Sequence, residues 1–482
     1  MTATSRTQAT EFVQGIGPIA AISMVVGTMI GSGIFIVSAD IGRQVNDWGP
    51  GALLLVWAVT GIMTVTGALA YAELAAMMPT AGGQYVFLRD GLSPLVGFLF
   101  GWTLFTVIQT GTIAAVAVAF GKFVSVLAPG VTPDVFLSLG HLPMPGGTIE
   151  LGLSWQRIVA LGVVALLTAL NVRGVKLGAT IQTVFAVAKV GALAALVLFG
   201  VTLATAAPGV ASQPFWGTGA WTVALIPIFG AAMVGSLFSA DAWNNVTFAA
   251  AEVREPKRNL PLALGAGTAT VCILYLLANV AYLRVLPFAG DPAGVDALSR
   301  GIQHAAQDRV GVAAAEVMFG PTGGVLMAVA IMLSTFGCVN GLVLAGPRVY
   351  YAMAADGLFF ERAGQLDPRF KTPVFGLGAQ AIWAMVLCLS GTYSNLLDYV
   401  IFASLLFYFF TVLALFRLRV KRPDMPRPVR AFGYPIVPGL YLLAVTALMV
   451  ILLFKKPLYT WPGLIIVALG IPVYHFWRRG RA

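Results

Sequence analysis

Apolar segments of roughly 20 residues recur along this chain from its N-terminal region to its C-terminus. Each is long enough to cross the hydrocarbon core of a bilayer as an α-helix. The composition agrees, because 59% of the 482 residues are hydrophobic, only 10% are charged, and the mean hydropathy is +0.88. Soluble domains carry about 25% charged residues. The sequence therefore predicts an all-α integral membrane protein in the lipid bilayer, without a separate soluble domain.

Hydropathy predicts about twelve membrane-spanning helices. We expect them at 14–42, 50–78, 93–127, 155–172, 176–204, 220–250, 260–286, 321–355, 374–392, 394–419, 435–454 and 459–478. This divides the chain into a cytoplasmic N-terminal tail at 1–13, a ten-helix core at 14–419, and two further helices with a short tail at 420–482.

The basic residues predict how the chain is oriented. An even number of spans places both termini on one side, and 20 of the 29 Lys and Arg residues fall in segments on that side, against eight on the other. By the positive-inside rule, both termini are expected to be cytoplasmic, in a multi-pass protein of the cytoplasmic membrane. The net charge of +10 then reflects topology. Nucleic acid is not a predicted partner, because no basic face on a soluble module is present.

Two of the predicted spans are interrupted by residues that weaken a membrane helix. The first contains VGTMIGSGIF, residues 26–35, and the sixth contains FSADAWNN, residues 238–245. The two spans lie five apart, so they cross in opposite directions, as in an inverted repeat of 14–204 and 220–419. Paired broken helices at corresponding positions indicate the binding site of a transporter.

A helix broken at mid-membrane leaves backbone polar groups without partners, which a ligand can satisfy. The free N–H groups of Ser32, Gly33 and Ile34 suit a carboxylate. Carbonyls near residues 28–30, with those of Phe238 and Ser239, suit an ammonium group. Such a pair of acceptors describes an α-amino acid. The alternative reading is that Gly27 and Gly31 form a small-xxx-small packing motif.

A lysine lies in the middle of the fifth span. Lys189 has no acidic residue within one helical turn, and a buried lysine must pair, bond to carbonyls or lose its proton. We expect its ammonium group to replace a sodium ion, bridging the first span to Ser334, Thr335 and Cys338 of the eighth. The alternative is that Lys189 snorkels to the membrane interface.

Few other residues suggest chemistry. The cysteines lie in apolar spans without metal-ligand spacing, and the three histidines lie in or beside loops, so no metal, no cofactor and no enzymatic activity is predicted. Asp241 would favour cationic or polar substrate side chains if it faces the pocket. Phe238 is a candidate lid, and Glu73 is a candidate salt-bridge residue at an interface or gate.

Several ordered motifs resemble the amino acid–polyamine–organocation (APC) superfamily, most closely the L-type amino acid transporters and bacterial relatives, with the cationic amino acid transporter-like branch next. The motifs are VGTMIGSGIF, PTAGGQYVFLRDGL, the fifth-span lysine, FSADAWNNVTFAAAEVREPKRNLP, PRVYYAMAADGLFFERAGQLDPRFKTP and KRPDMPRPVRAFGYPIVP. The resemblance covers essentially the whole chain. It implies a LeuT-like fold of five-plus-five inverted repeats, working by alternating access.

The resemblance also implies roles for individual residues. It assigns the substrate carboxylate to Ser32 and Gly33, an aromatic lid to Phe238, and sodium independence to Lys189. It further implies neighbouring and pocket-backbone contacts at Met29, Ile30, Gly31, Ser239, Ala240 and Asp241.

Two departures from the family pattern matter. Ala242 stands where the family often has glycine, which can narrow the pocket. The loop at 128–154 has no cysteine, so we expect no disulfide-linked accessory subunit. The sequence thus predicts a sodium-independent amino acid permease, either an exchanger or a facilitator. Proton-coupled symport, possibly of cationic amino acids, and an amino acid sensor built on a transporter fold remain as alternatives.

Overall fold

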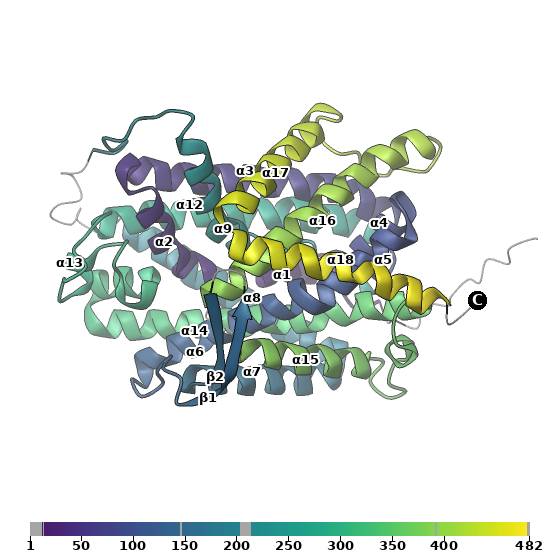
Figure 1. Ribbon diagram of the computed structural model, residues 1–482, viewed down its shortest axis with the longest axis horizontal. Coiled ribbons are helices and arrows are strands. Elements are labelled where there is room, and N and C mark those ends of the chain that lie inside the picture. Colours follow the sequence, from purple (N-terminus) through teal and green to yellow (C-terminus); the bar gives the residue numbers. More distant parts are fainter. Residues whose placement is uncertain (1–11, 13, 145–146, 203–213, 391–392, 480–482) are drawn as a thin grey trace, which may run out of the picture.

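The computed structural model describes residue 12 and residues 14–144, 147–202, 214–390 and 393–479 (Figure 1). Most helices lie side by side along the long axis of the molecule. Among the described residues, nine helices are long and apolar enough to cross a membrane, and three shorter apolar helices, α1, α9 and α15, accompany them. The prediction of about twelve spans is confirmed. The predicted tail at 1–13 lies outside the described residues, apart from Phe12.

The first span is broken, as predicted. Helix α1 (Pro18–Met29) ends where Ile30 becomes extended, a 3₁₀ turn η1 follows at Gly33–Phe35, and α2 (Val37–Gln44) completes the crossing. Pro18 occupies the first turn of α1, where its missing N–H costs no hydrogen bond. The segment between α1 and η1 is fully buried, so the break lies inside the protein rather than against lipid.

The sixth span breaks in the corresponding place. Helix α9 (Leu225–Ser239) stops at Ala240, and the chain resumes as the short helix α10 (Asn245–Phe248) and the 3₁₀ turn η5 (Ala250–Glu252). The break at 240–244 falls within the interruption expected from FSADAWNN.

The remaining elements follow the predicted order. They are η2 (Asn46–Trp48), α3 (Gly49–Met77), α4 (Gln84–Gly91), α5 (Pro94–Thr103), η3 (Leu104–Ile108), α6 (Gln109–Leu127), α7 (Trp155–Val172), α8 (Val175–Thr202), α11 (Pro256–Leu262), η6 (Ala263–Gly267), α12 (Thr268–Val285), α13 (Ala297–Arg300), η7 (Ala306–Asp308), α14 (Val310–Ala355), η8 (Glu361–Gly364), α15 (Val374–Cys388), α16 (Tyr393–Lys421), α17 (Ile436–Lys455) and α18 (Pro457–Arg479).

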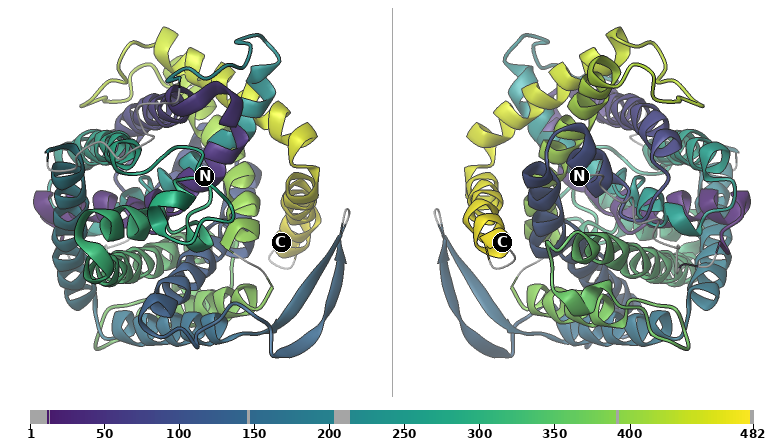
Figure 2. Two further views of the ribbon diagram at one scale, coloured as in Figure 1. Left: turned by 90° about the vertical axis from the view of Figure 1, so that its left-hand side faces the viewer. Right: turned by 90° about the vertical axis from the view of Figure 1, so that its right-hand side faces the viewer.

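Two features differ from the predicted helices. Helix α14 contains a kink at Gly320, whose φ of +70° only glycine adopts readily. The part of α14 after this kink begins at Pro321, which is where the eighth span was expected to begin. The loop at 128–154, for which no regular structure was expected, contains an antiparallel hairpin of β1 (Leu137–Met144) and β2 (Gly147–Leu153). The hairpin projects from the helical body (Figure 2).

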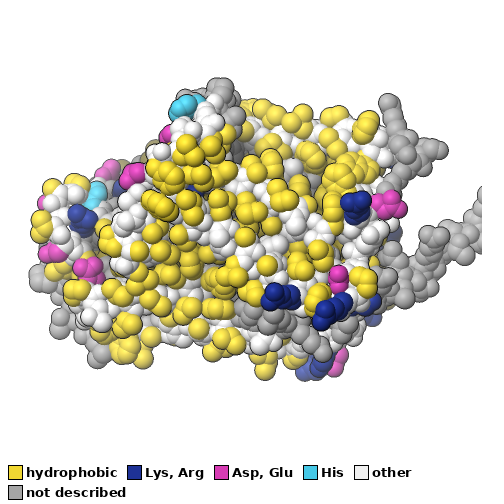
Figure 3. Space-filling model, turned by 90° about the horizontal axis from the view of Figure 1, so that it is seen from below, with side chains coloured by type: hydrophobic (Ala, Val, Ile, Leu, Met, Phe, Trp, Pro, Cys, Tyr) yellow, Lys and Arg dark blue, Asp and Glu magenta, His cyan; other side chains and the backbone are white. Residues whose placement is uncertain are grey.

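The outer surface matches a membrane protein. Hydrophobic side chains cover most of the face in Figure 3, and charged side chains gather toward its two ends. Among the exposed apolar residues are Val187, Leu198, Ile382, Leu443 and Leu469, all in helices assigned as apolar spans. Lipid is as apolar as these side chains, so their exposure carries no penalty in a bilayer.

Candidate substrate site at the two broken helices

The break in the first span leaves backbone donors open. Among the hydrogen bonds of the described residues, the N–H groups of Gly31, Ser32 and Gly33 have no protein partner. The hydroxyl of Ser32 is also buried without a partner. Ile34 lies within η1 and is fully buried. These N–H groups and the Ser32 hydroxyl therefore form a cluster of buried donors without a protein acceptor in the described part of the chain, as required for an anion site.

The glycines of the first break permit close packing. None of Gly27, Gly31 and Gly33 has a positive φ. A Cβ atom on Gly33 would lie 2.1 Å from the Ser239 Oγ, and one on Gly27 would lie 2.1 Å from the Gln182 Nε2. The small residues therefore bring helices together, as the packing interpretation predicts, and Gly33 brings the two breaks into contact.

Lys189 reaches the first break from α8. Its side chain is 1% exposed, and its Nζ donates hydrogen bonds of 2.7 Å to the carbonyls of both Gly27 and Ile30. These carbonyls lie where the helical hydrogen bonding of α1 ends, so the ammonium group compensates their partial negative charge. Lys189 does not reach the membrane interface, which rules out snorkelling in this structure.

The eighth span contributes further donors. The Ser334 hydroxyl lies 3.1 Å from the Ile30 carbonyl and 3.3 Å from that of Gly31, and the Cys338 thiol lies 3.0 Å from the Thr28 carbonyl. Thr335 differs, because its hydroxyl donates to Ile331 and Met332 in its own helix. The structure thus brings Ser334 and Cys338, but not the hydroxyl of Thr335, to the carbonyls beside Lys189.

A tyrosine that sequence analysis missed joins the two breaks. The hydroxyl of Tyr275 in α12 lies 2.8 Å from the Met29 carbonyl and 3.0 Å from the Ser239 carbonyl. Both carbonyls were expected to be open for a substrate ammonium group. The single O–H proton of Tyr275 donates to one of these carbonyls at a time or is shared between them, so they are not both fully open, whereas the N–H groups of the first break have no acceptor among the described residues.

Ala242 adopts a backbone conformation that favours glycine. Its φ is +64°, a left-handed conformation that costs a residue with a Cβ about 1 kcal/mol or more. Its carbonyl lies 3.0 Å from the Thr28 hydroxyl, which has a single proton and also has the Met24 and Val25 carbonyls at 2.7 and 3.1 Å. The bend of the sixth span therefore lies in direct contact with the first break.

The Asp241 carboxylate faces α16. It accepts a short hydrogen bond from the Tyr408 hydroxyl and a second, of 3.4 Å, from Ser404. Asn244 donates to the Gln84 Oε1 at 2.6 Å, which brings the segment PTAGGQY after the second span to the sixth break. The motif containing Gln84 was noted in the sequence, but its proximity to the site was not predictable from it.

A cavity adjoins the sixth break. Its polar lining includes Gln84, Gln109, Asp241, Asn244, Asn245 and Tyr408. The Nδ2 of Asn245 is buried and has no partner. Phe238, the candidate lid, is 6% exposed and lies in the last turn of α9, and Ala240 is equally enclosed at 2%. The site therefore combines open backbone donors at one break with polar side chains at the other.

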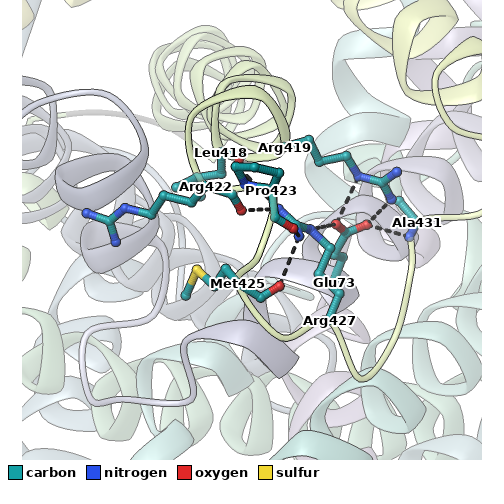
Figure 4. Close-up of polar contacts among 8 residues, drawn as sticks. All are labelled: Glu73, Leu418, Arg419, Arg422, Pro423, Met425, Arg427 and Ala431. Atoms are coloured by element: carbon teal, nitrogen blue, oxygen red, sulfur yellow. Dashed lines mark hydrogen bonds and ion pairs between the residues drawn. The ribbon is translucent and has the colours of Figure 1, made fainter.

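Buried ion pairs close the end of the bundle that carries the termini. Figure 4 shows Glu73 of α3 between Arg419 of α16 and Arg427 of the following loop. The Glu73 Oε2 lies 2.5 Å from the Arg419 Nη2 and 2.7 Å from the backbone nitrogen of Ala431, and its Oε1 lies 3.3 Å from the Arg427 Nε. Glu73 is therefore a salt-bridge residue, as expected.

A second pair seals the same end closer to the breaks. Arg348 of α14 and Glu252 of η5 are almost fully buried and meet at 2.8 Å. The backbone of Ile16 bonds to Glu252 and Arg254 on either side of Val253, so the entry to the first span is fixed to the exit of the sixth. These contacts therefore link α14, η5 and the start of the first span at this end.

Contacts of α2 lie at the opposite end. Arg43 donates to the Gln303 carbonyl at 2.6 Å and to the Asp308 carboxylate at 2.7 Å. Partial burial lowers the pKa of Arg43, but the hydrogen bond and charge of Asp308 outweigh it, so its pKa is raised above the ordinary value. The ion pair links α2 to the segment that precedes α14.

Metal ligands do not gather in the described part of the chain, where no group of three or more His, Cys, Asp or Glu side chains could hold an ion. The fold and the site together define a secondary transporter, because two discontinuous helices meet around an enclosed site at mid-membrane.

Comparison with known proteins specifies the family. Residues 16–474 match the family model for amino acid permeases, and the chain belongs to this family. The human large neutral amino acids transporter small subunit 2 is 31% identical over 95% of this chain and 79% of its own length. The mouse b(0,+)-type amino acid transporter 1 is 27% identical, covering 97% and 88%. The serine/threonine exchanger SteT of Bacillus subtilis is also 27% identical, covering 97% of both chains. The family is one of transporters and not of enzymes.

Proposed function

We propose that this protein is a sodium-independent amino acid exchanger that works by alternating access. The observation that carries the proposal is Lys189, whose ammonium group lies 2.7 Å from each of the carbonyls of Gly27 and Ile30. A fixed positive charge there takes the role that a bound sodium ion would have, so transport needs no sodium gradient. The similarity to the serine/threonine exchanger SteT and to the b(0,+)-type amino acid transporter 1 supports amino acids as substrates.

The substrate carboxylate binds the N–H groups of Gly31, Ser32 and Gly33 in this proposal. The argument is chemical: a buried cluster of backbone donors with the Ser32 hydroxyl suits an anion and few other groups. The backbone at Met29 and Ile30 borders this site, with Ile34 immediately after it. The ammonium group binds the carbonyls of Phe238 and Ser239, which also accept from the Asp241 N–H and from the Tyr275 hydroxyl, respectively. Phe238 covers the bound substrate.

The substrate side chain extends toward the cavity beside Asp241. Its lining combines amide and hydroxyl groups with Phe100, Leu104, Ile108, Leu342 and Phe407, so it suits a small neutral side chain that can meet both kinds of surface. The carboxylate of Asp241 is engaged by Tyr408 and Ser404, and this supports neutral substrates. Ala240 and Asp241 supply the adjoining backbone.

Proton-coupled symport is the second candidate, and Asp241 is the observation that favours it. This carboxylate is buried beside the cavity without a basic partner within salt-bridge distance among the described residues. A carboxylate in such surroundings can carry a proton through the transport cycle.

Location, partners and repeats complete the proposal. The basic residues support cytoplasmic termini in a cytoplasmic membrane. The absence of cysteine at 128–154 supports a chain that works without a disulfide-linked accessory subunit. The matching breaks support inverted repeats at 14–204 and 220–419, followed by two added helices at 420–482.

Uptake into proteoliposomes tests the proposal. The purified chain is reconstituted with or without internal amino acid, and entry of labelled serine, alanine, leucine and arginine is measured across sodium and pH gradients. We expect uptake that requires internal substrate and does not respond to sodium. Stimulation by sodium contradicts the role of Lys189, and uptake driven by an inward proton gradient in empty vesicles favours symport. Binding without any flux supports the alternative of an amino acid sensor.

A further inference from the structure

Among the described residues, the hydrogen bonds that join the hairpin of β1 and β2 to the helical body lie at its base. The backbone nitrogen of Gly152 donates to the Leu389 carbonyl at 3.1 Å, just after α15. The buried Arg157, in the first turn of α7, donates to the carbonyls of Gly152 and Leu389 at 2.8 and 3.0 Å. The base of the hairpin is therefore fixed at the level where two membrane spans, α7 and α15, end.

From this base the hairpin runs across the direction of the spans. In Figure 1 β1 and β2 lie crosswise to α14 and α15, and in Figure 2 they project sideways from the helical body. A hairpin pointing into water would continue along the helix direction instead. An element that starts at the ends of spans and extends sideways stays at the boundary between lipid and water.

The strand register gives the hairpin two different faces. Leu137 pairs with Leu153, and His141 pairs with Glu150. Residues directly opposite in an antiparallel pair share a face, and faces alternate along each strand. Leu151 therefore lies on the same face as Leu153, and the pair of His141 and Glu150 lies on the other.

Leu137, on the face that carries Leu151 and Leu153, is 48% exposed. Leu139 lies at a shift in the strand register and is 55% exposed. Phe136, just before β1, and Trp155, at the start of α7, are 54% and 52% exposed. The rings of Phe136 and Trp155 pack against each other with centroids 5.3 Å apart. Exposed aromatic residues at the ends of spans are typical of the membrane interface. A two-stranded hairpin is marginally stable in water, so a covered apolar face would help to maintain it.

We propose that this hairpin is a membrane-interface element, with its leucine-rich face and the Phe136 and Trp155 rings set into the lipid of the leaflet opposite the termini. The occupant of the face is lipid, because the apolar face continues the lipid-exposed surface of the spans from which it emerges. His141 and Glu150 point toward the water and the lipid headgroups. This inference does not depend on the proposed substrate.

Fluorescence quenching in lipid nanodiscs tests the proposal. Leu137→Cys and His141→Cys, two exposed positions on opposite faces of β1, are each labelled with an environment-sensitive fluorophore in the full-length protein. Wild-type protein, whose Cys338 and Cys388 are buried and whose Cys272 is partly exposed, gives the background. Nitroxide-bearing phosphatidylcholine reports lipid contact, and iodide reports contact with water.

We expect the label at position 137 to be quenched severalfold more strongly by the nitroxide lipid, and severalfold less by iodide, than the label at 141. Equal iodide quenching at both positions would show that the hairpin stands in water and would overturn the proposal. Shielding of position 137 from both quenchers would show that protein covers this face, and that result would overturn it as well.

Discussion

The breaks in the first and sixth spans expose the same backbone groups but satisfy them by different means. At the first break the sequence is glycine-rich and uncharged, and its carbonyls are met by side chains from other helices, above all Lys189. At the sixth break the polar groups are local, with Asp241 and Asn244 inside the break and Ala242 in a left-handed conformation. In this account the break of the first span presents backbone groups to a substrate, and the break of the sixth span provides side chains.

Lys189→Met should have the largest effect, because it removes the side chain that meets the carbonyls of the first break from another helix. Two buried carbonyls would each lose a donor, at about 1–3 kcal/mol apiece. We expect exchange in proteoliposomes to fall at least about 30-fold. Lys257→Met, at an exposed position in the first turn of α11, is the matched control and should retain full exchange. Equal exchange by both variants would remove Lys189 from the account.

Tyr408→Phe tests the side-chain chemistry of the sixth break. The carboxylate of Asp241 would lose a hydrogen bond worth about 1.5–3 kcal/mol for a charged acceptor. We expect a clear loss of thermal stability in detergent and a higher KM for polar substrates. Tyr282→Phe is the control, because the Tyr282 hydroxyl is buried without a partner. If both variants lose thermal stability equally, the hydrogen bond from Tyr408 of α16 to Asp241 makes no specific contribution to stability.

The spans, the two breaks and the residues beside them were predictable because they depend on local signals. Twenty-residue apolar segments, glycines within one of them and an acid within another are visible without any knowledge of packing. Lys189 was identified because a mid-span charge needs a partner, although its two carbonyls could be assigned only approximately.

The donors that meet the breaks from other helices were not predictable. Tyr275 and Tyr408 are two of 13 tyrosines, and nothing in the sequence separates a bridging hydroxyl from an ordinary aromatic core residue. The carbonyls of Met29 and Ser239 were expected to be open to substrate for this reason. The hairpin was missed because PMPGG, residues 143–147, reads as a loop and the flanking strands alternate only weakly.

Gly33→Ala tests how closely the two breaks must approach. The added Cβ would lie 2.1 Å from the Ser239 Oγ and 3.0 Å from the Ser239 Cα, so α9 would have to move. Overpacking of this kind costs about 1–3 kcal/mol, and we expect exchange to fall about 5- to 150-fold. Gly191→Ala in α8, where a Cβ meets nothing within 4 Å, should leave exchange unchanged. Normal exchange by Gly33→Ala would mean that the breaks need not touch.

Ala242→Gly should have the smallest effect and the opposite sign. Glycine adopts the φ of +64° without a Cβ penalty, so the variant should be more stable by about 1 kcal/mol, seen as a rise in melting temperature. Ala240→Gly, two residues earlier at a φ of −93°, gains no such relief and should be less stable than wild type. A loss of stability in both variants would argue against strain at the sixth break.

The central claim is that the first break binds the carboxylate of an amino acid while Lys189 holds the carbonyls beside it. An experimental structure of the protein with a bound amino acid tests it most directly. The account predicts carboxylate oxygens within hydrogen-bonding distance of the Gly31, Ser32 and Gly33 nitrogens, with the Lys189 Nζ still on Gly27 and Ile30. A carboxylate paired with Lys189 itself, or an amino acid bound away from both breaks, would contradict it.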